Sequence, residues 1–290
     1  MKVISLNVRG FGSSKGIDKF GWVKNIIRKE KPHFVAIQES RLNLIDRKWV
    51  SSLCGFSEFD FIQQEKVGNS GGQLLIWDSN YFEAISIIRF DHVLGVCGTW
   101  KYSGCKLNVI NVYGPHDDQN KQKLWDCLSK LLEHHDVDND VAWLLCGDFN
   151  EVREQGERFN CEFLEYRAKR FNDFINNSCL IEIPLGGRSF TRVSDDGLKF
   201  SKLDRFLVSG KFCIEWGNLM AIALEREHSD HCPIVLKDED INFGPKPFKM
   251  FDAWLDEKDI DEVIIDAWKE DVKITSRKDC VFRNKLKNVK

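Results

Sequence analysis

The sequence has no long hydrophobic run and no internal repeat. No stretch approaches the roughly 18 apolar residues that a membrane-spanning helix needs. The N-terminus already turns polar at Ser5 and Asn7, too early for a secretory signal peptide. We therefore expect an intracellular protein, nuclear or cytoplasmic and not secreted, with no membrane partner.

Paired cysteines and a strong excess of one charge are also missing. The ten cysteines form no CxxC pair, and several, such as Cys97 and Cys146, lie within apolar runs, as buried thiols of a reducing compartment do. The net charge is -3, from 42 Lys and Arg against 45 Asp and Glu. This balance does not indicate nucleic-acid binding, which usually makes a domain basic. It does not exclude such binding either, because a bound metal or a local basic patch can supply positive field.

What the sequence does contain is enough apolar material for a large core. Its 290 residues, 42% hydrophobic and 12% aromatic, suit one large domain with an appendage or two modest domains. Many short apolar runs of strand type alternate with a few amphipathic helices, which predicts an α/β protein with two packed sheets and helices outside. Helices are expected near 17–27, 124–132 and 171–175, and strands near 3–8, 34–37, 71–77, 84–90, 94–102, 106–113, 141–146, 189–193, 204–208, 219–224 and 233–237.

The composition changes after residue 238. An acidic turn and the segment Gly244-Pro245-Lys246-Pro247 are typical of a domain end followed by a stiff linker. Residues 252–262 are acidic, and residues 273–290 carry seven Lys and Arg against one Asp. We predict a domain over residues 1–238, and over 239–290 a linker with a C-terminal helical extension too poor in apolar residues to form its own core.

Three polar clusters stand at the edges of buried-strand patterns. They are Gln38-Glu39-Ser40, Gly147-Asp148-Phe149-Asn150 and Ser229-Asp230-His231. Burying unpaired carboxylates would cost several kcal/mol each. The clusters therefore predict that these strand ends converge and that their acids surround a cation.

Each cluster also has a simpler interpretation. Glu39 suits a hard divalent cation such as Mg²⁺, but a surface Glu that caps a loop would look the same. Asp148 and Asn150 share one face of a strand, suited to a water and a phosphoryl oxygen, but Gly, Asp and Asn are also turn residues. His231 is a candidate acid or base with Asp204 as its orienting carboxylate, although a lone His is more often structural. Asn7 and Tyr113 end two further strands. The Tyr113 hydroxyl could hold a phosphate or a water, but a tyrosine at the rim of the fold would look the same.

In this order the motifs resemble the endonuclease/exonuclease/phosphatase superfamily, also described as DNase I-like. The resemblance covers roughly residues 1–237 and implies a four-layer αββα sandwich with its site at one mouth of two packed sheets. It rests on Ser5-Leu6-Asn7-Val8-Arg9-Gly10, Gln38-Glu39-Ser40, Gly71-Gly72, Asn111-Val112-Tyr113-Gly114-Pro115, Gly147-Asp148-Phe149-Asn150, Ser189-Phe190-Thr191, Leu203-Asp204-Arg205 and Ser229-Asp230-His231.

A narrower resemblance is to the endonucleases of plant LINE-type, non-LTR retrotransposons. It rests on the stretch from Ser201 to Ser209, on Phe243-Gly244-Pro245-Lys246-Pro247-Phe248-Lys249, and on the tryptophans Trp254 and Trp268. In those elements a reverse transcriptase follows. None is expected here, so the chain resembles a truncated element or a host gene derived from one. Related abasic-site repair enzymes carry an acid where this chain has Arg9, which disfavours that activity.

The resemblance implies a role for each site residue. Glu39 would bind Mg²⁺, or alternatively Mn²⁺, with Asn7 and Asp230 supporting it. Asp148 would orient or deprotonate the attacking water, and Asp204 would hold His231. Further contacts to the scissile phosphate or the substrate would come from Asn150, His231, Tyr113, Thr191 and Ser229. The sequence leaves open whether Asp148 or His231 is the general base.

The expected function is therefore a Mg²⁺-dependent phosphodiesterase with DNA as its partner and no obligate protein partner. The first hypothesis is an endonuclease that nicks one strand, as in LINE-type retrotransposition. The second is a phosphatase or exonuclease of the same fold, since fold does not fix substrate. The third is a catalytically idle remnant whose tail binds a partner or nucleic acid.

Overall fold

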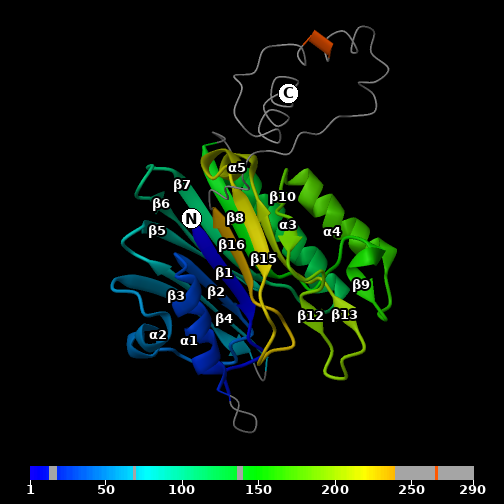
Figure 1. The fold of residues 1–290 in the computed structure, drawn as a ribbon, viewed down its shortest axis with the longest axis horizontal. Coiled ribbons are helices and arrows are strands. Elements are labelled where there is room, and N and C mark those ends of the chain that lie inside the picture. Colours follow the sequence, from blue (N-terminus) through cyan, green and yellow to red (C-terminus); the bar gives the residue numbers. More distant parts are fainter. Residues whose placement is uncertain (13–17, 68–69, 136–139, 239–264, 267–290) are drawn as a thin grey trace, which may run out of the picture. The chain divides into compact units, whose positions relative to one another are not determined.

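The computed structural model describes residues 1–12, 18–67, 70–135, 140–238 and 265–266. The chain divides into two compact units, Met1–Asp240 and Ile241–Lys290. Both large sheets belong to the first unit (Figure 1). Of the second unit only 265–266 are described, so the predicted linker and C-terminal helical extension over 239–290 lie outside the described residues and stay a prediction.

Two large sheets form the centre of the first unit. Sheet A consists of β1 (Lys2–Asn7), β2 (Phe34–Gln38), β3 (Phe59–Val67), β4 (Ser70–Asp78), β11 (Leu185–Gly186), β15 (Leu219–Ala223) and β16 (Ile234–Asp238), in the order β11-β15-β16-β1-β2-β4-β3. Sheet B consists of β5 (Phe82–Phe90), β6 (Val93–Trp100), β7 (Lys106–Tyr113), β8 (Val141–Asp148), β10 (Ile181–Glu182) and β14 (Asp204–Val208), in the order β10-β14-β8-β7-β6-β5.

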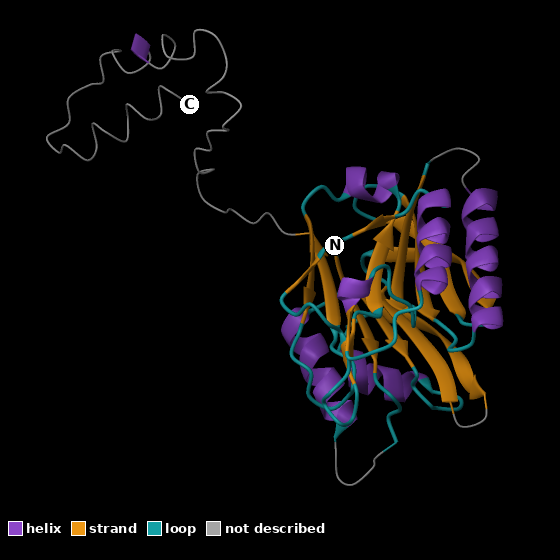
Figure 2. Ribbon diagram, turned by 90° about the vertical axis from the view of Figure 1, so that its right-hand side faces the viewer, coloured by secondary structure: helices purple, strands orange, loops and turns teal. Residues whose placement is uncertain are grey.

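Helices cover the outer faces of both sheets (Figures 1 and 2). The helices α1 (Lys19–Glu30) and α2 (Arg47–Cys54) pack on sheet A, and α3 (Asp118–His135) and α4 (Glu165–Asn177) pack on sheet B. The predicted four-layer αββα sandwich is confirmed. The remaining elements are α5 (Gly210–Glu215), the 3₁₀ turn η1 (Gln155–Glu157) and a small sheet of β9 (Arg158–Phe159), β12 (Arg192–Val193) and β13 (Phe200–Ser201).

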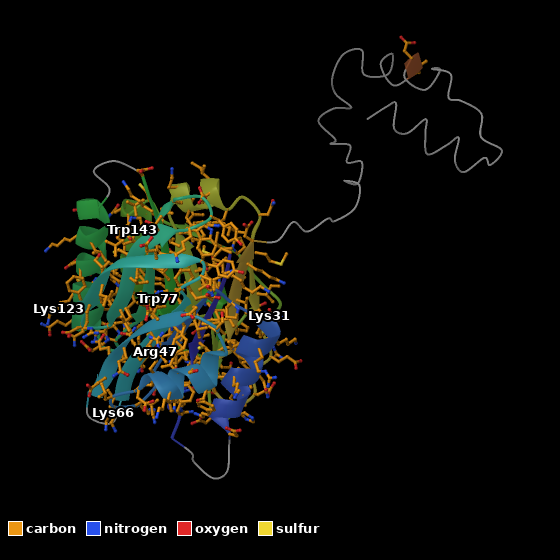
Figure 3. The ribbon with its side chains drawn as sticks, turned by 90° about the vertical axis from the view of Figure 1, so that its left-hand side faces the viewer. Lys31, Arg47, Lys66, Trp77, Lys123 and Trp143 are labelled. Carbon is orange, nitrogen blue, oxygen red and sulfur yellow. The ribbon has the colours of Figure 1, made fainter. Side chains whose placement is uncertain are left out.

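Three apolar clusters hold these layers together. The central cluster lies between the sheets and includes Phe34, Val96 and Phe206. The second joins α1 and α2 to sheet A, and the third joins α3 and α4 to sheet B around Trp125 and Trp143. Trp77 and Trp143 are both buried, whereas Lys66 and Lys123 lie at the periphery (Figure 3). Among the described residues, no helix combines the length and the apolar character needed to cross a bilayer.

The strand registers bring the polar strand ends together. Strands β1 and β2 run parallel with Asn7 opposite Gln38, and β7 and β8 run parallel with Tyr113 opposite Asp148. Strand β14 is antiparallel to β8, and its first residue, Asp204, pairs with Asp148. Because parallel strands end at the same edge of a sheet, these residues share one end of the sandwich.

A buried polar network links the two sheets just beneath that end. The Gln38 side-chain amide donates to Asn111 Oδ1 at 2.7 Å and to Ser5 Oγ at 3.0 Å. The Asn111 amide in turn donates to the backbone carbonyls of Ile37 and Leu74. Such a network, with its donors paired, fixes the spacing of the two sheets where the site is built.

A short helix and a long edge strand on sheet A's side were not predicted from the sequence. Helix α2 is short, and its apolar positions Val50, Leu53 and Cys54 fill barely two turns, too few for a clear period. Asp46 caps it by accepting a hydrogen bond from the Trp49 amide at 2.7 Å. Strand β3 is an edge strand rich in polar residues, so its alternation is weak. The meander near 84–113 is confirmed as β5, β6 and β7.

Candidate active site

His231 lies between two buried carboxylates. Its Nδ1 is 2.8 Å from Asp204 Oδ2, and its Nε2 is 3.6 Å from Asp148 Oδ2. All three side chains are at most 4% exposed. The predicted pairing of Asp204 with His231 is therefore present, and it directs Nε2 towards Asp148.

The two carboxylates change the proton affinity of the imidazole. Burial lowers the pKa of His231, but Asp204 and Asp148 more than offset this and raise it to about 9. Burial raises the pKa of Asp148, while His231 acts in the opposite direction. The group therefore holds a proton strongly near Nε2, where it can be passed to or taken from a third group.

Asp148 is fixed by two asparagines. Asn7 donates from Nδ2 to Asp148 Oδ2 at 3.0 Å, and the Asn150 backbone amide donates to Asp148 Oδ1 at 2.9 Å. Asn150 itself has φ 51° and donates from Nδ2 to the Gly114 carbonyl at 2.7 Å. The carboxylate of Asp148 therefore has one defined orientation.

Gly147 in the Gly147-Asp148-Phe149-Asn150 motif is required by the close approach of two strands. Its φ is +145°, and a Cβ there would stand 1.9 Å from the Val112 carbonyl oxygen of the neighbouring strand. Only glycine allows β7 and β8 to stay paired up to Asp148.

Thr191 and Ser229 use their hydroxyls on backbone groups. Thr191 Oγ1 accepts hydrogen bonds from the amides of Leu203 and Asp204, both at 3.0 Å. Ser229 Oγ donates to the Asn7 carbonyl at 2.7 Å and accepts from the His231 amide at 3.1 Å. These contacts hold Asp204 and His231 in place, and the predicted substrate contacts of both residues stay predictions.

Glu39 stands on a strained loop beside Tyr113. Its φ is 51°, and the adjoining residues Ser40 and Arg41 donate backbone hydrogen bonds to the carbonyls of Gly72 and Gly71. The pKa of Tyr113 is raised by burial and then by the charges of Glu39 and Asp148. Tyr113 thus lies within electrostatic reach of both, and it connects the Glu39 loop to the His231 group.

Arginines neutralise the two acids predicted to bind metal. Arg41 donates from Nε to Glu39 Oε1 at 3.0 Å. Asp230 Oδ2 lies 3.6 Å from Arg9 Nη1 and 3.4 Å from Arg192 Nε. Arg9 also pairs with Asp195, which raises the pKa of its guanidinium, and Asp230 and Glu39 raise it further.

Two groups of side chains are candidate binding sites for a divalent cation. Among the described residues, Asp148, Asp204 and His231 offer ligand atoms within 4.8 Å of one another. However, His231 Nδ1 and Asp204 Oδ2 already share a hydrogen bond, and Mg²⁺ prefers oxygen ligands. Glu39, Asp230 and the Asn7 amide oxygen offer only oxygens, of which Asn7 Oδ1 accepts a hydrogen bond from the Arg9 amide at 2.9 Å. Each group also contains one buried carboxylate oxygen without a hydrogen-bond partner, Asp204 Oδ1 in the first and Asp230 Oδ1 in the second. By ligand type the second set fits a hard cation better.

Two buried ion clusters behind the site were not predicted. Lys121 donates from Nζ to Glu151 Oε2 at 2.6 Å and to the Asn150 carbonyl at 2.7 Å, and so supports the Asn150 turn. Arg205, next to Asp204, pairs with Glu157 and Glu182 while its side chain is 0% exposed. Only the second cluster left a signal in the sequence, because Arg205 is a charged residue inside the apolar strand pattern of residues 203–208.

Comparisons with known proteins identify the family of the chain. The model of the Endonuclease/Exonuclease/phosphatase family matches residues 4–231, a span that includes every predicted site residue. The chain belongs to this family, whose members are hydrolases of phosphate esters or phosphodiesters and use divalent metals. No curated protein matches the chain in sequence.

Several solved structures share the fold. The AP endonuclease LMAP from Leishmania major superposes with TM-score 0.64 at 17% identity, over 81% of this chain and 86% of that one. A 3′ phosphatase, NExo, from Neisseria bound to a product DNA hairpin has TM-score 0.64 at 17% identity, over 82% and 99%. A mannosyl-6-phosphatase from Bacteroides thetaiotaomicron has TM-score 0.58 at 14% identity, over 82% and 98%. Identities this low show the fold alone.

Proposed function

We propose that this chain is a divalent-metal-dependent phosphodiesterase, and that it is a DNA endonuclease that nicks one strand, as LINE-type endonucleases do. The observation that carries the proposal is the buried series Asp204, His231 and Asp148, which Tyr113 connects to Glu39. A series of this kind suits the hydrolysis of a phosphodiester, in which a water must be aligned and a charged phosphate stabilised.

Each residue has a proposed role. Glu39 would hold Mg²⁺ or Mn²⁺ with Asp230 and Asn7, and the cation would neutralise charge on the phosphate and the leaving oxygen. Asp148, fixed by Asn7 and the Asn150 amide, would orient the attacking water. His231 would donate from Nε2 to a phosphoryl oxygen or accept the water's proton, while Asp204 keeps its ring in place.

Further residues would contact or frame the phosphate. Tyr113 stays protonated at neutral pH, because its pKa is raised, and its hydroxyl would donate to a phosphoryl oxygen. The Asn150 side chain would reach the same phosphate, with Thr191 and Ser229 holding the surrounding backbone.

A phosphatase or 3′–5′ exonuclease is the second candidate. It is favoured by the structural similarity to a 3′ phosphatase bound to DNA and to a 3′–5′ exonuclease, both from Neisseria. Arg9 disfavours cleavage at abasic sites, since it puts a cation beside Asp230 at the position where the resemblance to abasic-site enzymes would place an acid.

The test is metal-dependent nicking of a supercoiled plasmid. Wild type with Mg²⁺ should convert it to the relaxed circle and leave a 3′ end that a polymerase extends. Asp148→Asn should lower this rate about a thousandfold, whereas Asp126→Asn, the same change at an exposed site on α3, should not. If the wild type releases phosphate from a 3′-phosphorylated oligonucleotide but does not nick, the second candidate replaces the first. If Asp148→Asn nicks as fast as wild type, the proposed site is wrong.

Metal binding itself offers an independent test of Glu39. Arg41→Gln should tighten Mg²⁺ binding about fivefold, because the guanidinium that competes for the carboxylate is removed and exposed ion pairs are worth up to about 1 kcal/mol. Calorimetric titration of the metal-free full chain with MgCl₂ measures this. Arg47→Gln, an exposed arginine paired with Asp60, is the control and should leave the affinity unchanged. Unchanged or weaker binding by Arg41→Gln would remove Glu39 from the metal site.

A further inference from the structure

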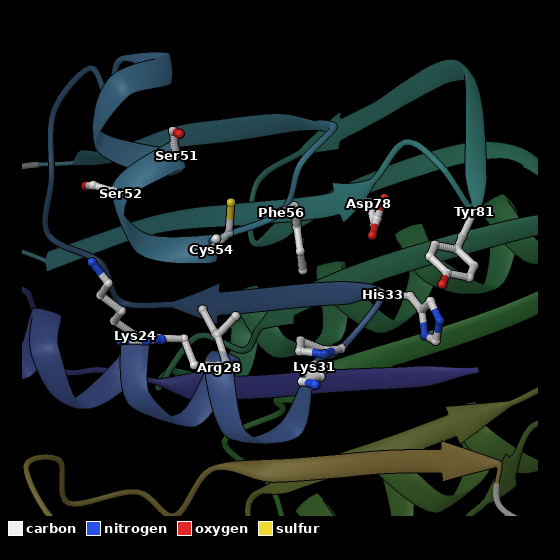
Figure 4. A pocket seen from close by; sticks show the side chains of 13 residues that line it. Lys24, Arg28, Lys31, His33, Ser51, Ser52, Cys54, Phe56, Asp78 and Tyr81 are labelled. Atoms are coloured by element: carbon white, nitrogen blue, oxygen red, sulfur yellow. The ribbon is translucent and has the colours of Figure 1, made fainter.

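A groove lined by cations reaches the end of the sandwich away from the proposed active site. A groove of about 630 Å³ runs between α1 and α2 and ends beside His33, Asp78 and Tyr81 (Figure 4). His33 comes just before β2, and the residues of the Glu39 loop follow its other end. With strands rising about 3.3 Å per residue, the His33 end of the groove and Glu39 are separated by the length of β2, roughly 17 Å.

Three cations, two from α1 and one from its C-cap, line one side of this groove. Lys24 and Arg28 are spaced i and i+4, so they lie on one face of the helix. Lys31 is the left-handed C-cap that follows Glu30, and it lines the same groove. Figure 4 shows them across the groove from Ser51 and Ser52 of α2. Within the described parts of the chain, none of the three cations has an ion-pair partner.

The fold accounts for only part of this stripe. A helix C-terminus favours cations, which explains Arg28 in the last turn and Lys31 at the C-cap, but the effect does not reach Lys24. Like charges at i and i+4 destabilise a helix slightly. The acid that lines the groove, Asp78, already accepts two hydrogen bonds from Asn80. The stripe is therefore suited to an anion from outside.

Aromatic rings continue the groove at its far end. Tyr81 lines the groove and stacks on Tyr102, with centroids 5.6 Å apart, and on Trp100 at 5.8 Å. Tyr102 is 78% exposed, so the face of its ring that does not stack on Tyr81 is open. A cationic groove that tracks phosphates, next to aromatic rings on which bases stack, is the combination that binds single strands.

From this arrangement we infer that the groove between α1 and α2 is a binding site for single-stranded nucleic acid. Lys24, Arg28 and Lys31 contact successive phosphates, and an unpaired base stacks on Tyr102. A duplex fits less well, because its bases are already stacked on one another and cannot lie on the ring. The site is separate from the proposed chemistry, so it holds a strand without cleaving it.

The test compares the full chain with a double charge reversal. Lys24→Glu/Arg28→Glu should weaken binding of a labelled oligo(dT), followed by fluorescence anisotropy in EDTA, by about tenfold. It should also reduce the slope of log affinity against log salt by about 1.4, since two phosphate contacts are lost. Lys123→Glu/Lys130→Glu, with the same charge change on the exposed face of α3, is the control and should bind nearly as wild type does.

Tyr102→Ala tests the stacking without any charge change. Its affinity for oligo(dT) should fall about tenfold. A thermal melt checks that the variant is folded. Plasmid nicking by the groove variants should stay at the wild-type rate at saturating substrate. If the groove double variant binds as well as the α3 control, or if Tyr102→Ala binds as wild type, the inference is overturned. If neither the wild type nor any variant nicks the plasmid, while oligo(dT) binding changes as expected, only the endonuclease proposal is overturned.

Discussion

His231→Ala should lower the rate of metal-dependent phosphodiester hydrolysis about a thousandfold, within the range that a positioned acid or base contributes. The side chain is buried between Asp204 and Asp148, and its Nε2 lies 3.6 Å from Asp148 Oδ2. Alanine removes both the proton at this position and the positive charge beside Asp148. The measurement is the initial rate of plasmid nicking at saturating Mg²⁺.

A structural role for His231 predicts a different result. If the imidazole only filled space, His231→Gln would retain much of the activity, because glutamine replaces one hydrogen bond and most of the volume. If it transfers a proton or stabilises charge, Gln should be nearly as slow as Ala. His116→Gln, at an exposed histidine, is the matched control and should nick at the wild-type rate. More than a tenth of wild-type activity in a folded His231→Ala protein would contradict the assignment.

The convergence of the site was predictable because it depends on strand ends. Glu39, Asp148 and His231 each adjoin an apolar run, and runs of that kind become buried strands. Once β7 and β8 are parallel neighbours, Tyr113 must lie beside Asp148. The pairing of Asp204 with His231 was likewise predictable, since an adjacent residue such as Asp230 points away on an extended segment.

The contacts of individual polar atoms were not predictable in the same way. Thr191 and Ser229 could be placed at the site, but not the fact that their hydroxyls serve backbone amides. The pairing of Arg9 with Asp195 joins residues 186 positions apart through a hairpin whose geometry no periodicity encodes. The groove between α1 and α2 was missed because α2 itself was missed.

Arg205 was hidden for a further physical reason. A charged residue inside a strand normally faces solvent, yet this side chain is fully buried against Glu157 and Glu182. Its Nη1 lies 2.9 Å from Glu157 Oε1 and 2.7 Å from Glu182 Oε1. Only three-dimensional structure brings these acids, from η1 and β10, to the strand that begins with Asp204.

Arg205→Met should therefore destabilise the protein by about 3 kcal/mol at neutral pH, because it leaves two buried carboxylates without their main partner. Lys202 and Arg153 still pair with Glu182, which keeps the loss at the lower end of the range for broken buried pairs. Chemical denaturation of the full chain measures the change. Arg188→Met, which breaks the exposed pair with Glu225, should cost less than about 1 kcal/mol.

The same prediction has a pH signature. Burial raises the pKa of Glu182, but Arg205 and then Lys202 and Arg153 lower it more, to about 2 from the usual 4.5. Below pH 4.5 Glu182 becomes protonated in the unfolded chain but stays ionised in the folded protein. Wild-type stability therefore falls between pH 4.5 and 2. In Arg205→Met this pKa moves back up and the loss shrinks. The stability difference between the two proteins should thus be largest at pH 7 and decrease by pH 3. A difference that is constant with pH would mean that Arg205 stabilises through packing, for instance on Phe171, and not through its charge.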